Sequence, residues 1–108
     1  PALLAPGSTI GILGGGQLGR MLAMAAARLG YRVHIFAPEA DSVAAEVAAS
    51  FTCAAWDDAP ALAAFAQGCD AITYEFENVP VAPLARLDQT LLAPPPVALE
   101  VAQDRLAE

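Results

Sequence analysis

The residues best suited to chemistry form the glycine-rich run 14–20, with the letters GGGQLGR. An apolar stretch at 9–13 precedes the run, and a helix-like stretch at 17–29 follows it. A strand, a glycine turn and a helix in this order bring the free N–H groups of a helix N-terminus beside a flexible turn. The run therefore predicts a site for an anion such as a phosphate or a carboxylate.

The spacing of Gly14, Gly16 and Gly19 also matches the fingerprint of dinucleotide-binding folds, so an NAD-binding oxidoreductase module is one interpretation. The second half of that fingerprint is an acidic residue at the end of the second strand, where it binds ribose hydroxyls. If 33–36 is that strand, Ala37 stands where the acid belongs. The missing carboxylate weakens the dinucleotide interpretation.

A turn without any ligand is the plainest alternative, because glycines also allow a helix to pack closely on a strand. Gln17 and Arg20 favour a ligand instead. In the first turn of the helix they offer an amide and a positive charge beside the glycines. We therefore expect Gln17 to face a bound molecule.

A second group of polar residues, YEFENVP at 74–80, directly follows a predicted strand at 71–74. The carboxyl ends of parallel strands meet at one edge of a sheet, so Glu75 is expected near the glycine turn. Strand alternation sends Glu75 and Glu77 to the same side. Two carboxylates suit the hydroxyls or amine of a ligand whose phosphate is held elsewhere, and a solvated acidic loop is the alternative.

Composition limits the partners of this 108-residue chain, which has the size of one domain. Its formal net charge is −7, so nucleic acid and anionic membrane surfaces are poor partners. All five basic residues are Arg, so any lysine that a reaction needs must come from elsewhere. We see no signal peptide, membrane span or metal-ligand spacing, and expect a cytoplasmic protein.

Strand-like and helix-like segments alternate along the chain, which predicts the α/β class: a Rossmann-like parallel sheet with helices on both faces. The predicted strands are 9–13, 33–36, 51–54, 71–74 and 91–93. The predicted helices are 17–29, 43–49, 61–67, 83–87 and 97–106. Residues 1–94 would form the domain and 95–108 the start of a linker helix. That helix continues to Glu108 without a polar tail, so we expect a fragment of a longer protein.

The remaining reactive or aromatic side chains are expected to be structural. Cys53 and Cys69 lack CxxC spacing and lie in apolar surroundings, which predicts buried free thiols in a reducing compartment. His34 lies inside a strand, and Trp56 follows one, so both are predicted to be packing residues. Asp58 is expected to begin a helix.

Taken together, GGGQLGRM at 14–21, YEFENVP at 74–80, PPP at 94–96 and QDRL at 103–106 resemble the N-terminal domain of the N5-carboxyaminoimidazole ribonucleotide synthase family. The resemblance extends from about residue 9 to the end. This family belongs to the ATP-grasp superfamily, and its first domain is called a pre-ATP-grasp domain. The resemblance implies a carbon-nitrogen ligase that carboxylates 5-aminoimidazole ribonucleotide with bicarbonate in purine biosynthesis, using ATP and Mg²⁺.

The resemblance also implies roles for single residues. Gln17 and Leu18 would lie against the ribonucleotide at the turn formed by Gly14, Gly16 and Gly19, and Glu75 would contact its ribose or ring. Arg105 matches an arginine that contacts ATP phosphates. No catalytic residue and no metal ligand is expected in this fragment, which should be inactive alone and bind no cofactor tightly. Family members form homodimers, so a dimer is expected.

Two other interpretations stay open beside the oxidoreductase module. The formate-dependent glycinamide ribonucleotide transformylase belongs to the same superfamily, but its turn usually carries Glu-Leu where this chain has Gln17 and Leu18. A domain that only folds and dimerises is the other.

Overall fold

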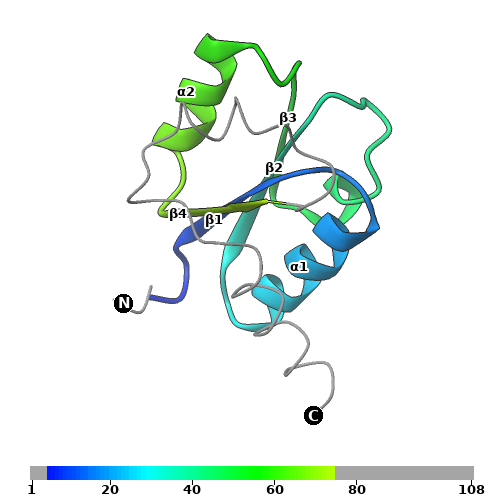
Figure 1. Cartoon of the computed structure of the whole chain (residues 1–108). Coiled ribbons are helices and arrows are strands. Elements are labelled where there is room, and N and C mark those ends of the chain that lie inside the picture. The colour runs from blue at the N-terminus through cyan, green and yellow to red at the C-terminus, as the bar shows by residue number, and fades with distance from the viewer. Residues whose placement is uncertain (1–4, 75–108) are drawn as a thin grey trace.

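The computed structural model describes residues 5–74 of the chain, and these residues form a parallel sheet flanked by helices (Figure 1). The four strands are β1 (Thr9–Leu13), β2 (Arg32–Ala37), β3 (Ser50–Cys53) and β4 (Ala71–Tyr74). They lie in the order β3-β2-β1-β4, and each neighbouring pair is parallel. The predicted α/β class with a parallel sheet is therefore confirmed.

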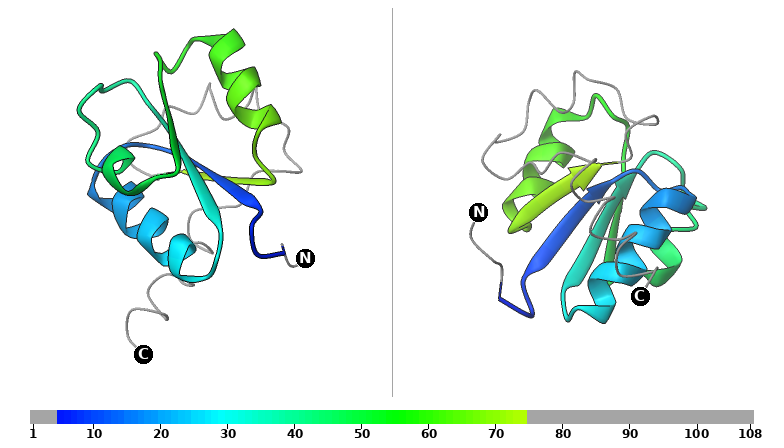
Figure 2. Two further views of the ribbon diagram at one scale, coloured as in Figure 1. Left: turned by 180° about the vertical axis from the view of Figure 1, so that it is seen from behind. Right: turned by 60° about the horizontal axis from the view of Figure 1, so that its bottom comes forward.

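Helices cover both faces of this sheet, as the two views of Figure 2 show. Helix α1 (Gln17–Arg28) packs on one face, and α2 (Ala59–Gln67) packs on the other. Because side chains alternate along a strand, Ile12 contributes to the core under α1, while the next residue, Leu13, contributes to the core under α2. The strands are thus apolar on both sides, which confirms the Rossmann-like arrangement.

The ends of the helices follow the signals in the sequence. Gly30 has φ +91° just after α1, a conformation that glycine adopts without strain. At α2, an Asp58 carboxylate oxygen accepts a 3.1 Å hydrogen bond from the N–H of Ala61. The helix begins at Ala59, two residues earlier than the predicted 61–67, because Asp58 is the N-cap and Pro60 is tolerated in a first turn.

The predicted helix at 43–49 is wrong. This segment contains only a single 3-10 turn, η1 (Ala45–Val47). Ala48 is already extended, and the N–H of Ala49 donates a 2.9 Å hydrogen bond to the carbonyl of Val33 on β2. The chain must rejoin the sheet at β3 so soon that no room is left for an α-helix, and this tertiary requirement overrides the helix propensity of its alanines.

The prediction of two buried thiols is right for Cys69 and wrong for Cys53. Both cysteines are free, but Cys53 is exposed. It is the last residue of β3, which lies at one end of the described sheet, and its Sγ lies 3.5 Å from the carbonyl oxygen of Pro38. Cys69 lies under α2 among apolar side chains, where burial and the Asp70 carboxylate raise its pKa to about 11.

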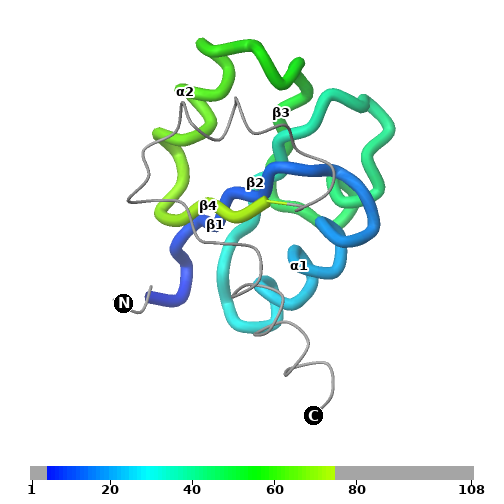
Figure 3. Tube along the Cα trace, in the orientation of Figure 1, coloured from blue at the N-terminus to red at the C-terminus, as the bar shows by residue number. Residues whose placement is uncertain are grey.

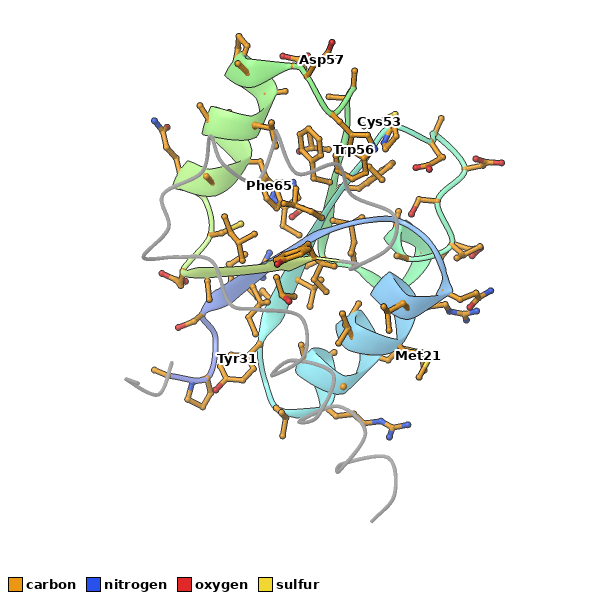
Figure 4. All side chains as sticks on the ribbon, viewed as in Figure 1. Met21, Tyr31, Cys53, Trp56, Asp57 and Phe65 are labelled. Carbon is orange, nitrogen blue, oxygen red and sulfur yellow. The ribbon has the colours of Figure 1, made fainter. Side chains whose placement is uncertain are left out.

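The aromatic residues near β2 are structural, as predicted. Trp56 packs on Phe36 with ring centroids 5.7 Å apart, and Figure 4 shows Trp56 and Phe65 on the α2 side of the sheet, away from Met21 of α1. His34 Nε2 lies 2.7 Å from Thr52 Oγ1, and its ring meets Phe65 edge-on. Partial burial lowers the pKa of His34.

Several predictions fall on residues outside the described range. These are the strand at 91–93, the helices at 83–87 and 97–106, and the division into 1–94 and 95–108. Glu75, Glu77 and Arg105 also lie there. For these residues the sequence-based expectations stay predictions.

Candidate anion site at the glycine turn

The glycine turn joins the carboxyl end of β1 to the start of α1. Gly14 has φ +126°, a conformation that disfavours any residue with a side chain, and its N–H donates a 2.9 Å hydrogen bond to the carbonyl of Phe36 on β2. The first residue of the turn is therefore hydrogen-bonded to the neighbouring strand. This hydrogen bond ties the turn, and with it the start of α1, to the end of the sheet.

The N-cap residue of helix α1 is a glycine, which has no side chain to cap the first backbone N–H groups of the helix. Gly16 is the N-cap, and the first hydrogen bond of the helix runs from the N–H of Arg20 to the carbonyl of Gly16, at 3.0 Å. The N–H groups of Gln17, Leu18 and Gly19 come before that bond and point out of the helix end. Together with the helix dipole they favour an anion.

The side chains of this first turn have different surroundings. Gln17 is exposed, so its amide can meet a ligand in solution. Leu18 is half-buried and packs against the core under α1, so its backbone N–H is the part that can reach a ligand. Gly19 is buried. Arg20 is half-buried, and its Nε is buried without a hydrogen-bond partner among the described residues.

The turn is held from the side by the chain that leaves β2, and Figure 3 shows these two segments next to each other. The Ser42 hydroxyl donates a 2.8 Å hydrogen bond to the carbonyl of Gly15, and the N–H of Ala44 donates another, of 3.2 Å, to the same oxygen. This role of Ser42 could not be predicted from the sequence, because its partner Gly15 lies 27 residues away and leaves no local signal.

The space at the end of β2 argues against a dinucleotide. Ala37, the last residue of β2, is 0 % exposed, and its Cβ would lie 2.8 Å from a Cβ placed on Gly15. A dinucleotide fold carries at this point a carboxylate that faces the ribose. In this chain Ala37 is buried against Gly15, which leaves no room at this position for a carboxylate that faces a ribose.

The turn also lies at the point where the strand order of the sheet changes direction. The chain runs outward from β1 to β2 and β3, then crosses back to β4 on the other side of β1. Leu13 and Tyr74, the last residues of β1 and β4, are register partners. Ligands of open parallel sheets bind outside the carboxyl ends of the strands at such a switch point. The structure therefore puts the glycine turn where a ligand is expected.

Residues 5–74 contain the helices α1 and α2. Neither of the two helices there combines the length and the apolar character that crossing a bilayer requires. In the same residues no three His, Cys, Asp or Glu side chains gather closely enough to coordinate a metal ion.

Comparison with known proteins identifies the class. Residues 7–103 match the family described as ribonucleotide synthetase preATP-grasp domain, and the chain belongs to this family. A similar curated protein is the N5-carboxyaminoimidazole ribonucleotide synthase of Brucella melitensis biotype 1, which is 60% identical over 106 residues. That match covers 97% of this chain and 29% of the relative. The resemblance inferred from the motifs is thus confirmed.

Solved structures give the same assignment. The N5-carboxyaminoimidazole ribonucleotide synthetase from Thermus thermophilus is 51% identical with a TM-score of 0.73, over 90% of this chain and 27% of that one. The Aspergillus clavatus synthase in complex with ADP and 5-aminoimidazole ribonucleotide is 30% identical with a TM-score of 0.67, over 82% and 24%. The chain spans less than a third of the length of the curated relatives it matches.

Proposed function

We propose that this chain is the N-terminal part of an ATP-dependent carbon-nitrogen ligase that carboxylates 5-aminoimidazole ribonucleotide with bicarbonate in purine biosynthesis. The observation that carries the proposal is the glycine turn at the switch point of the sheet, in a member of the ribonucleotide synthetase preATP-grasp family. The names of its relatives support the reaction, and the Aspergillus structure contains this ribonucleotide.

In this proposal the start of α1 binds the ribonucleotide. The exposed amide of Gln17 and the N–H groups of Gln17 and Leu18 donate hydrogen bonds to its oxygens. Gly14 and Gly16 shape the turn, and Gly19 lets α1 pack close to the sheet. Binding here orients the ribonucleotide, whose exocyclic amine is the nucleophile of the reaction.

Glu75 is proposed to bind the ribose or the ring of the same ligand. Tyr74 packs with the core under α2, and alternation along a strand would direct the next side chain to the α1 side of the sheet. The glycine turn leads to α1 on that side. A carboxylate there would accept hydrogen bonds from hydroxyl or amine groups while the phosphate is held elsewhere.

The carboxylation itself is assigned to a longer polypeptide. ATP and Mg²⁺ would be bound mainly by residues that this chain does not contain, with Arg105 contributing to the ATP phosphates. The absence of lysine from the whole sequence supports this division, because phosphoryl transfer needs positive charge at the phosphates.

The complete protein is proposed to be a cytoplasmic homodimer. The two free cysteines suit a reducing compartment. The exposed apolar side chains of Met21 and Met24 on α1, and of Leu29 just after it, suit a protein interface.

A phosphate-release assay with ATP, bicarbonate and 5-aminoimidazole ribonucleotide tests this proposal. A longer protein that contains this chain should release phosphate only when the ribonucleotide is present, and the 108-residue chain should release none. Turnover that needs formate and glycinamide ribonucleotide instead would favour the transformylase. Full turnover by the 108-residue chain would contradict the proposal that carboxylation needs residues that this chain does not contain.

A further inference from the structure

Ser42 is one of the few buried polar side chains in the described part of the chain, at 6 % exposed. Its hydroxyl makes two hydrogen bonds. It donates to the carbonyl of Gly15 at 2.8 Å and accepts from the N–H of Ala45 at 3.1 Å. One hydroxyl therefore joins the turn after β2 to the turn after β1.

The bond to Gly15 is made one residue before the N-cap of α1. A peptide group is planar, so fixing the carbonyl of Gly15 also fixes the plane of the peptide that it shares with Gly16. Gly16 is the N-cap of α1. Because Ala44 donates to the same carbonyl at 3.2 Å, this peptide plane is held by two hydrogen bonds from the 42–44 segment.

The contact between the two turns is also closely packed. A Cβ placed on Gly15 would lie 2.4 Å from Ser42 Oγ and 2.8 Å from the Cβ of Ala37. The turn therefore has no space to move toward the end of β2. Loss of the hydroxyl would leave the carbonyl of Gly15 with one hydrogen bond and a small gap beside it.

We propose that Ser42 is a positioning residue for the anion site at the glycine turn. It acts through Gly15, by holding the N–H groups at the start of α1 in the orientation that a ligand needs. The identity of the ligand, 5-aminoimidazole ribonucleotide, rests on the proposed function, whereas the contact between the turns does not. Preorganisation of this kind raises affinity because the site loses less conformational entropy on binding.

The test compares Ser42→Ala with Asp58→Ala in the 108-residue chain. Each substitution removes a side chain that accepts a 3.1 Å hydrogen bond from a backbone N–H, that of Ala45 or that of Ala61. Only Ser42→Ala also releases the carbonyl of Gly15. Ser42→Ala should lower the free energy of unfolding, followed with denaturant, by more than Asp58→Ala does, because it loses a second hydrogen bond at a buried position. When both variants are compared in the folded state, only Ser42→Ala should differ from the wild type at the glycine turn.

Two measurements report on the turn. NMR order parameters of the amides at 15–18 should be about 0.85 in the wild type and in Asp58→Ala, and should fall to about 0.6 in Ser42→Ala. The dissociation constant of 5-aminoimidazole ribonucleotide should rise about tenfold in Ser42→Ala alone, as expected for the loss of one positioning hydrogen bond.

Unchanged order parameters in Ser42→Ala would overturn the proposal, and so would an equal loss of affinity in both variants. If the wild-type chain does not bind the ribonucleotide, the proposed ligand is wrong for this chain. The order parameters would still decide whether Ser42 positions the turn.

Discussion

The hydroxyl of Ser42 donates a 2.8 Å hydrogen bond to the carbonyl of Gly15, which lies 27 residues earlier in the sequence. The bond connects the loop that follows β2 to the turn that follows β1. Both segments lie at the carboxyl edge of the parallel sheet, where open α/β sheets bind their ligands. The geometry of the candidate site thus depends on a residue outside the glycine motif.

Replacing Gly15 should disturb both the fold and the site. In Gly15→Ala the new methyl group meets Ser42 Oγ and the Cβ of Ala37, so the two turns must separate. We expect a loss of about 1–3 kcal/mol in the free energy of unfolding, measured with denaturant. Gly68→Ala is the control, because a Cβ there has its nearest neighbour at 3.7 Å. Equal stability of the two variants would show that the contact between the turns is loose.

The amide of Gln17 should contribute to ligand binding without contributing to the fold. Its side chain is exposed at the start of α1, so Gln17→Ala should change the free energy of unfolding by less than about 0.5 kcal/mol. Affinity for 5-aminoimidazole ribonucleotide should fall roughly tenfold, measured by calorimetry. Gln67→Ala, at the exposed end of α2, is the matched control and should bind as the wild type does.

His34 should make the chain less stable at acidic pH. Burial lowers the pKa of the folded ring below its usual value near 6.5, so the unfolded chain binds a proton more readily in this range. The free energy of unfolding should therefore fall as the pH drops through about 6.5, and it should be regained above that value.

The control for this prediction is His34→Gln, which removes the only histidine of the chain. Denaturant unfolding of both proteins between about pH 7.5 and 5.5 gives the comparison. The variant should lose less stability than the wild type over this interval. An identical loss would mean that other groups cause the pH dependence.

The two thiols should differ in reactivity. Cys53 is exposed, whereas Cys69 is buried and its pKa is raised to about 11, which leaves almost no thiolate at neutral pH. Iodoacetamide should modify Cys53 in the folded chain and Cys69 only after unfolding, as peptide masses would show. Rapid labelling of Cys69 under native conditions would contradict the packing of Cys69 under α2.

The sequence was sufficient to predict the positions of the described strands and the parallel α/β class. Each of the four described strands lies within one residue of its predicted bounds, because apolar runs between glycine and proline signals mark buried strands well. The helix at 43–49 was predicted wrongly, since alanine content cannot report how soon the chain must return to β3. The exposure of Cys53 follows from its place at the end of an outer strand of the described sheet, which apolar neighbours do not reveal.

The candidate site was predictable only in part. The glycine spacing predicted the turn. Ala37 was predicted to stand where a dinucleotide-binding fold has its acidic residue, and it is the last residue of β2. The contact of Ser42 with the turn could not be predicted, because its partner Gly15 is distant in the sequence and is brought near only by the fold. Glu75 and Arg105 lie outside the described residues, and their roles stay predictions.

An NMR titration of the 108-residue chain with 5-aminoimidazole ribonucleotide and, separately, with NAD would identify the ligand of the glycine turn. We expect saturable shifts of the Gln17 and Leu18 amides with the ribonucleotide and none with NAD. Saturation by NAD at micromolar concentration, with no response to the ribonucleotide, would contradict the proposed function.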